Sequence, residues 1–169
     1  MLVKNPHTEI NLLLHIIDEA FDKKAWHGPN LRGAIRRLEL DEVAWRPGPG
    51  RHNIWEIVVH AAYWKYIVRR RLLGEKRGSF ALKGSNWFVC PIVSTAEAWR
   101  ADVALLEETH QQMRAAIAAM NPGDLHKKPP TSKVSNAALI AGIAAHDVYH
   151  AGQIQLLKRL ARASHSKSA

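Results

Sequence analysis

The sequence predicts an all-α protein, a four-helix bundle with a short extra helix. Four long segments carry apolar residues at spacings of three and four, which is the period of an amphipathic helix. The segments between them are rich in glycine and proline, and no stretch alternates in the way that a strand does. Four such helices can bury their apolar stripes only against one another, which favours a bundle.

The first half of the chain contains two of the long helices and the short one. The first long helix is expected over residues 6–24, and the short helix over residues 30–38, after Gly28-Pro29. The second long helix begins near Asn53 and continues to about residue 73. Asn53 is a suitable N-cap, and Glu56 three residues later completes the pattern of a capping box.

The second half contains the other two long helices. Residues 74–93 show no clean period, and an irregular connection of that length often forms a lid or a pocket wall. The third long helix is expected over residues 95–120, capped by Ser94 or Thr95, and the fourth from Ser135 or Asn136 to about residue 163. One domain of residues 1–163 and a flexible tail of residues 164–169 follow.

Composition excludes several classes of protein. The single cysteine rules out a disulfide framework and a cysteine-rich zinc finger. No apolar stretch is long enough for a membrane span, so a cytoplasmic protein without a membrane partner is expected. The formal net charge is +9, yet the basic run of Lys65 and residues 69–71 reads as a solvated helix end, and a nucleic-acid partner is not expected.

Three histidines fall on apolar helix faces. His146 and His150 are four residues apart in the fourth long helix, in the same stripe as Leu139, Ile143 and Ile154, so both imidazoles face the interior. His60 occupies the equivalent stripe of the second long helix. Three buried imidazoles without partners would be costly, whereas one divalent metal ion uses all three lone pairs and keeps an open position. Taken singly, each could instead be a hydrogen-bonded core histidine.

Asp147 directly follows His146, and three roles for it stay open. It resembles the acid of the H-E-x-x-H motif, in which the carboxylate is a general base, and is therefore a candidate catalytic residue. It could also hydrogen-bond a ligand imidazole such as His60, or be a solvated surface acid.

Other residues are weaker candidates for the site. His110 lies in the stripe of the third long helix as a fourth ligand, an acid–base group or a structural histidine. Cys90 reads as a buried structural thiol or, less simply, as a metal ligand. His27 and His52 could line the mouth of a pocket, and Tyr149 and Gln153 could lie at the edge of the site.

Two segments resemble the signature regions of the DinB-like (YfiT-like) metalloenzyme family. They are residues 53–64, NIWEIVVHAAYW, and residues 145–154, AHDVYHAGQI; residues 25–31 resemble an early loop of one subset. The resemblance implies a four-helix bundle of up-down-down-up topology, often homodimeric. It also implies that zinc or nickel is bound by His60, His146 and His150. Relatives include bacillithiol transferases and a mycothiol-dependent maleylpyruvate isomerase.

The sequence therefore predicts a metal-dependent enzyme acting on a small-molecule substrate. The ion could activate water for hydrolysis, as zinc does in many enzymes, or a low-molecular-weight thiol for S-transfer, as the resemblance implies. The alternative is a non-catalytic metal-binding or dimeric scaffold protein. The substrate itself is not written in the sequence.

Overall fold

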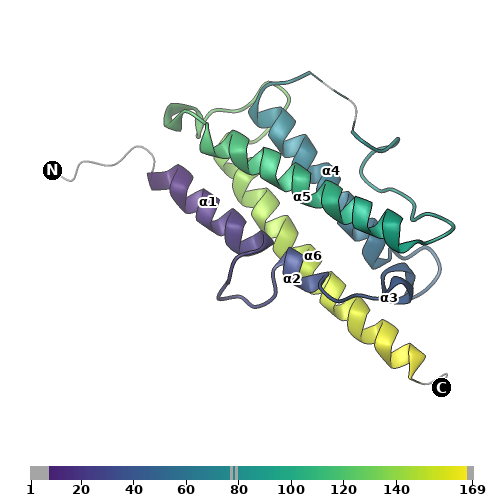
Figure 1. Cartoon of the computed structure of the whole chain (residues 1–169). Helices are drawn as coiled ribbons and strands as arrows, with labels where there is room; N and C mark the ends of the chain where they lie inside the picture. Colours follow the sequence, from purple (N-terminus) through teal and green to yellow (C-terminus); the bar gives the residue numbers. More distant parts are fainter. Residues whose placement is uncertain (1–7, 77, 79, 167–169) are drawn as a thin grey trace.

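The computed structural model describes residues 8–76, 78 and 80–166, and within them the protein is helical without a β-strand. Among the described residues, Ser85 and Trp87 form an isolated antiparallel β-bridge. Figure 1 shows the helices in order, with the long ones side by side. They are α1 (Thr8–Phe21), α2 (Leu31–Ala34), α3 (Leu40–Ala44), α4 (Ile54–Leu72), α5 (Ala96–Ala118), the 3₁₀ turn Pro122–Asp124 and α6 (Asn136–His165).

The long helices pack around two apolar cores. Helix α4 contacts α5 and α6, and α1 contacts α6 and α5, while α2 and α3 lie against α6. One core joins α4, α5 and α6 to the short helices and includes Trp55, Leu106 and Ile154. The other joins α1 to α5 and α6 and includes Ile17 and Met113. Beside these cores His60 and His150 are buried, and His146 is half-buried.

Side-chain caps confirm the predicted starts of three of the long helices, α4, α5 and α6. Asn53, Thr95 and Ser135 each accept a hydrogen bond from the backbone amide three residues later. The capping box predicted at α4 is wrong in its second half. The Glu56 amide donates to Asn53, but the Glu56 carboxylate turns away to other partners and does not return to the cap.

The other boundaries differ from the predictions by a turn or less, except in one region. Helix α1 ends at Phe21 and not at residue 24, and its expected start at residue 6 lies outside the described residues. The helix expected over residues 30–38 is shorter in the structure: α2 spans Leu31–Ala34, and Arg37, with a left-handed φ of 56°, lies in the turn that follows. A second short helix, α3, then starts at the capping box of Glu39 and Glu42.

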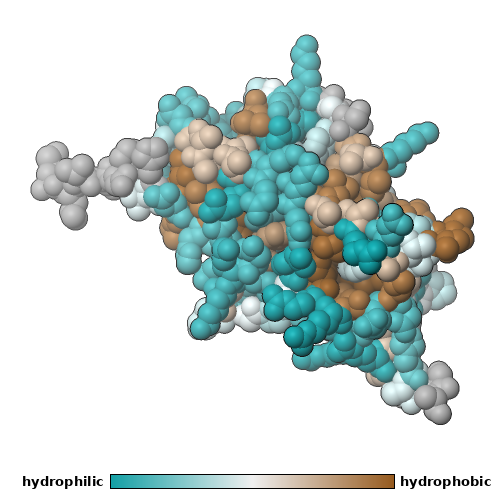
Figure 2. Space-filling view, viewed as in Figure 1, coloured by the Kyte–Doolittle hydropathy of each residue, from teal (hydrophilic) through white to brown (hydrophobic). Residues whose placement is uncertain are grey.

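Helix α6 reaches His165, two residues beyond its expected end, and residues 167–169 of the expected tail lie outside the description. The connection between α4 and α5 is irregular over its described residues, as predicted, and Figure 1 shows it running along the outside of α4. Figure 2 shows hydrophobic residues gathered where this connection meets the start of α5. Among the described helices, none is long and apolar enough to cross a membrane.

Candidate metal centre

Three histidine side chains converge where α4 crosses α6. His146 and His150 lie one turn apart on α6, and His60 faces them from α4. The His146 Nε2 lies 3.1 Å from the Nε2 of His60 and 3.0 Å from that of His150. All three ligand nitrogens lie within 4.8 Å of one another. A tetrahedral zinc ion with bonds of about 2.0–2.1 Å separates its ligands by roughly 3.3 Å, which is close to these spacings.

Hydrogen bonds on the far side of two rings fix their tautomers. The His60 Nδ1 donates to the backbone carbonyl of Asn86 at 2.8 Å, and a carbonyl can only accept. The His150 Nδ1 donates to Gln153 Oε1 at 2.7 Å, and the Gln153 amide nitrogen donates in turn to the Tyr149 hydroxyl. Both Nε2 atoms therefore present lone pairs to the same point, as metal-binding imidazoles do.

The pKa values of all three imidazoles are lowered, which favours their stabilisation by a shared metal cation. Burial lowers the pKa of His60, and it lowers the pKa of His146 to about 3, helped by the neighbouring rings and by Lys65. Burial likewise lowers the pKa of His150 to about 4. All three rings are thus neutral at pH 7, so protonation does not relieve the repulsion between their lone pairs. A divalent ion does, and the donor set therefore fits one.

The Asn86–Trp87 step forms one wall of the site. The Trp87 ring stacks on His60, with centroids 3.8 Å apart, and on its other face stacks on His52 at 3.6 Å. Asn86 accepts a hydrogen bond from Trp64 Nε1 at 2.9 Å and has a left-handed φ of 64°, which asparagine tolerates. Sequence reasoning missed both residues, because nothing in an irregular segment of the chain indicates which helix it will cover.

Glu56 forms hydrogen bonds that hold residues at the edge of the site in place. Its buried carboxylate accepts hydrogen bonds from both terminal nitrogens of Arg46, from His52 Nδ1 at 2.8 Å and from the Cys90 amide at 3.3 Å. Burial alone would raise the pKa of Glu56, but these bonds outweigh it and lower the pKa to about 2. The carboxylate is therefore charged at any ordinary pH, and it orients His52 through Nδ1.

The histidine cluster opens to two cavities. One, of about 170 Å³, is lined by Trp64, Arg71 and His146 among others. The second, of about 320 Å³, is lined by residues that include His52, Trp87, His150 and Gln153. Tyr149 also lines it, so the predictions that His52, Tyr149 and Gln153 lie at the edge of the site agree with the structure. Small molecules can therefore approach the cluster from either side of His146 and His150.

Asp147 follows His146 on α6, about 100° around the helix, and its side chain meets Lys65 of α4 instead of joining the cluster. It is 1% exposed and forms an ion pair with Lys65, so the interpretation as a solvated surface acid is wrong. It does not hydrogen-bond His60 either, since that Nδ1 is taken by Asn86. Burial raises the pKa of Asp147, and the Lys65 ammonium opposes this rise. The ion pair accounts for a buried carboxylate here, and the catalytic role of Asp147 stays a prediction.

The remaining candidates lie apart from the three histidines. His110 is 1% exposed and stacks on Phe21 with centroids 3.6 Å apart, outside the cluster. Cys90 is half-buried, and its sulfur lies 3.9 Å from the Ser94 hydroxyl. His27 lines a separate cavity of about 370 Å³ beside α6. The basic run is not the solvated helix end that was predicted, because Lys65 is fully buried and Arg70 is 8% exposed.

The sequence profile described as the DinB superfamily matches residues 25–154, a span that contains all three histidines. The chain belongs to the DinB superfamily. This confirms the resemblance found in the sequence, and the all-helical structure is consistent with it. No curated protein and no solved structure gives a significant match to the chain.

Proposed function

We propose that this protein is a metal-dependent enzyme whose His60, His146 and His150 bind one divalent ion, zinc or nickel. One observation carries the proposal: two imidazoles with Nδ1 held by carbonyl oxygens direct their Nε2 lone pairs at a third Nε2 about 3 Å away. In the pattern common to catalytic sites, three protein ligands leave a position for a water or a substrate.

The two cavities support catalysis over metal storage, because a storage or structural site is normally closed by protein ligands. When bound, such an ion supplies Lewis acidity, which lowers the pKa of a water or a thiol beside it. His52 lines the larger of these cavities, and its Nδ1 is fixed by Glu56. Its Nε2 has no partner among the described residues and can therefore take up a proton from a molecule held there.

The proposed substrate is a small molecule, and the reaction is either hydrolysis or S-transfer from a low-molecular-weight thiol. The proposal includes the up-down-down-up four-helix bundle that the resemblance implies. Figure 1 supports this topology, since α1 and α6 run in one direction and α4 and α5 in the other. A homodimer in the cytoplasm is part of the same expectation.

Metal content tests the site directly. Protein purified without chelator and under anaerobic conditions is expected to hold about one zinc or nickel ion per chain, measured by elemental analysis. His60→Ala and His150→Ala are each expected to remove most of it. The matched control is His126→Ala, which removes an exposed histidine far from the cluster. Equal metal content in the control and in both site variants would contradict the proposal.

A turnover screen then separates the enzyme from the non-catalytic alternative. The metal-loaded protein is incubated with small thiols and electrophiles, and separately with hydrolysable esters and amides. An activity that is lost in His60→Ala and kept in His126→Ala supports catalysis at this site. Full metal occupancy with no turnover in either panel would favour the metal-binding scaffold.

A further inference from the structure

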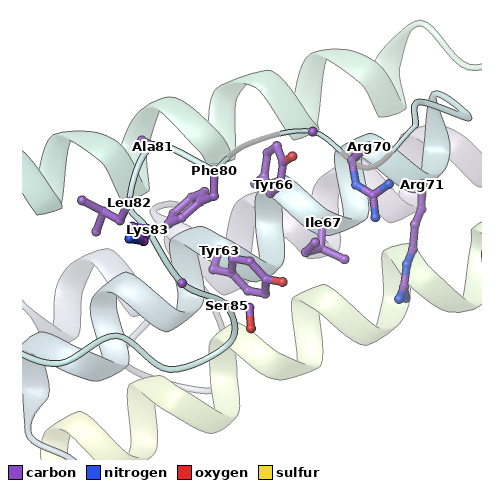
Figure 3. Close-up of a pocket in the computed structure, with 12 residues that line it drawn as sticks. Tyr63, Tyr66, Ile67, Arg70, Arg71, Phe80, Ala81, Leu82, Lys83 and Ser85 are labelled. Carbon is purple, nitrogen blue, oxygen red and sulfur yellow. The ribbon is translucent and has the colours of Figure 1, made fainter.

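A cavity of about 640 Å³ lies between α4 and the connection that follows it. Figure 3 shows Arg70 and Arg71 at one end, Phe80, Leu82 and Lys83 at the other, and the rings of Tyr63 and Tyr66 between them. None of its described lining residues is acidic, whereas three are cationic. This cavity has the volume of a typical small-molecule site and a lining of aromatic and aliphatic side chains with a few polar groups.

Several donors at this cavity have no acceptor among the described residues. Arg70 is 8% exposed. Its Nη1 donates to the Glu75 carbonyl at 3.2 Å, while its Nε is buried and has no hydrogen-bond partner. The Nε of Arg71 and the hydroxyl of Tyr66 are buried and unpaired as well. The nearby Glu75 carboxylate pairs with Arg69, and none of these three atoms bonds to it. Buried donors left without an acceptor destabilise a fold, so they mark a place for a ligand.

Interaction with the helix dipole explains why cations occur in the last turn of α4, but it does not explain why Arg70 is buried with an unpaired donor. Arg69 and Arg71 remain partly exposed. Arg70 and Arg71 line a cavity beneath residues 80–85, next to the rings of Tyr63 and Phe80. One end of this cavity is therefore positively charged, and the rest of its lining is largely aromatic and aliphatic.

We propose that this cavity binds a small organic anion. Arg70, Arg71 and Tyr66 receive its carboxylate or phosphate group, because guanidinium groups pair with both. Its hydrophobic part lies against Tyr63 and Phe80. None of the three clustered histidines lines this cavity, although Arg71 also lines the smaller cavity beside His146, and the inference does not depend on a bound metal. The wall of the cavity nevertheless continues from Ser85 into Asn86, whose carbonyl fixes His60.

Calorimetric titration of the full chain tests the proposal with four probes: phenyl phosphate, benzoate, inorganic phosphate and benzyl alcohol. Saturable binding of phenyl phosphate or benzoate is expected, with inorganic phosphate and benzyl alcohol each at least about tenfold weaker. Tighter binding of phenyl phosphate than of benzoate assigns the site to phosphate monoesters, and the reverse order assigns it to carboxylates. Equal binding of benzyl alcohol, or no saturable binding of either organic anion, would overturn the proposal.

Variants locate the binding. Arg71→Gln is expected to weaken it about tenfold or more, and Tyr66→Phe several-fold, through the lost donors. Arg69→Gln changes the adjacent arginine, which does not line the cavity, and is the matched control. Arg71 is partly exposed, so its replacement is compatible with folding, which circular dichroism verifies.

The His146→Ala/His150→Ala double variant separates this site from the proposed metal centre. Anion binding that persists in the double variant supports the cavity, whatever the metal content of the wild type. Binding that disappears there, or that Arg71→Gln leaves unchanged, would overturn the assignment.

Discussion

The interior of the bundle contains a small group of ionisable side chains that the proposed chemistry does not use. Lys65 from α4 pairs with Asp147 from α6, and its ammonium lies 5.0 Å from the centroid of the Phe21 ring. The same ring stacks on His110 from α5. Burial lowers the pKa of His110 to about 2, and the nearby Lys65 charge adds to the effect. His110 is therefore neutral in the folded protein across the physiological range.

This shift makes folding sensitive to acid. Below its ordinary pKa near 6.5, His110 binds a proton in the unfolded chain but not in the folded one, so stability falls as the pH drops. From pH 7 to pH 5 this single group is expected to lower the free energy of unfolding by about 2 kcal/mol. His110→Leu is expected to abolish that share of the loss, measured by urea unfolding of metal-free protein at the two pH values.

The exposed His126→Gln variant is the control for this measurement, and it should lose as much stability on acidification as the wild type. An equal loss in wild type and in His110→Leu would show that His110 does not remain neutral in the fold.

Residue spacing predicted the three metal-binding candidates but left the role of Asp147 open. His146 and His150 share an apolar stripe with known helical spacing, so their direction could be read from the sequence. Asp147 is rotated about 100° around the helix from His146. The partner that Asp147 meets is set by the neighbouring helix, and that partner, Lys65, is 82 positions away in the sequence. Long-range pairs of this kind leave no local signal.

At the scale of elements, capping residues located the starts of α4, α5 and α6, while the short helices and the long connection were harder to predict. Asn53, Thr95 and Ser135 act through their own backbone neighbours, so local sequence is enough to identify them. The turn after α2 contains a left-handed residue that is not glycine, Arg37, so composition does not reveal where the helix ends. The place of Asn86 over His60 depends on how the connection packs against α4 and α6, which the sequence does not determine locally.

The connection between α4 and α5 is expected to set the affinity of the metal centre. Trp87→Ala removes the ring that stacks on His60, and orienting partners of this kind change metal affinity by about tenfold or more. The expected result is weaker zinc binding with an unchanged helical spectrum, measured by competition with a chromophoric chelator. Trp26→Ala is the matched control, since Trp26 is 99% exposed in another connection. Equal affinities in the two variants would contradict a positioning role for Trp87.

At the scale of the whole molecule, the proposed metal joins two helices that are distant in the sequence. His60 and His146 are 86 positions apart, so an ion bound to both stabilises the packing of α4 on α6. Zinc at about a thousand times its dissociation constant is expected to stabilise the fold by about 4 kcal/mol and to raise the Tm by about 10 °C. Chelation should reverse the shift.

Thermal unfolding with zinc, with chelator and with neither measures this effect. The His60→Ala variant is expected to unfold at nearly the same temperature in all three conditions. A zinc-induced rise in Tm of the same size in that variant would place the stabilising ion elsewhere.

Two of the six tryptophans border the histidine cluster: Trp87 lies face to face with His60, and Trp64 meets His60 edge-on. Indole emission responds to the electronic state of an adjacent imidazole, and that state changes when a nitrogen lone pair is given to a cation. The protein thus carries its own optical reporter, through which loading and unloading of the centre can be followed in real time without dye or label.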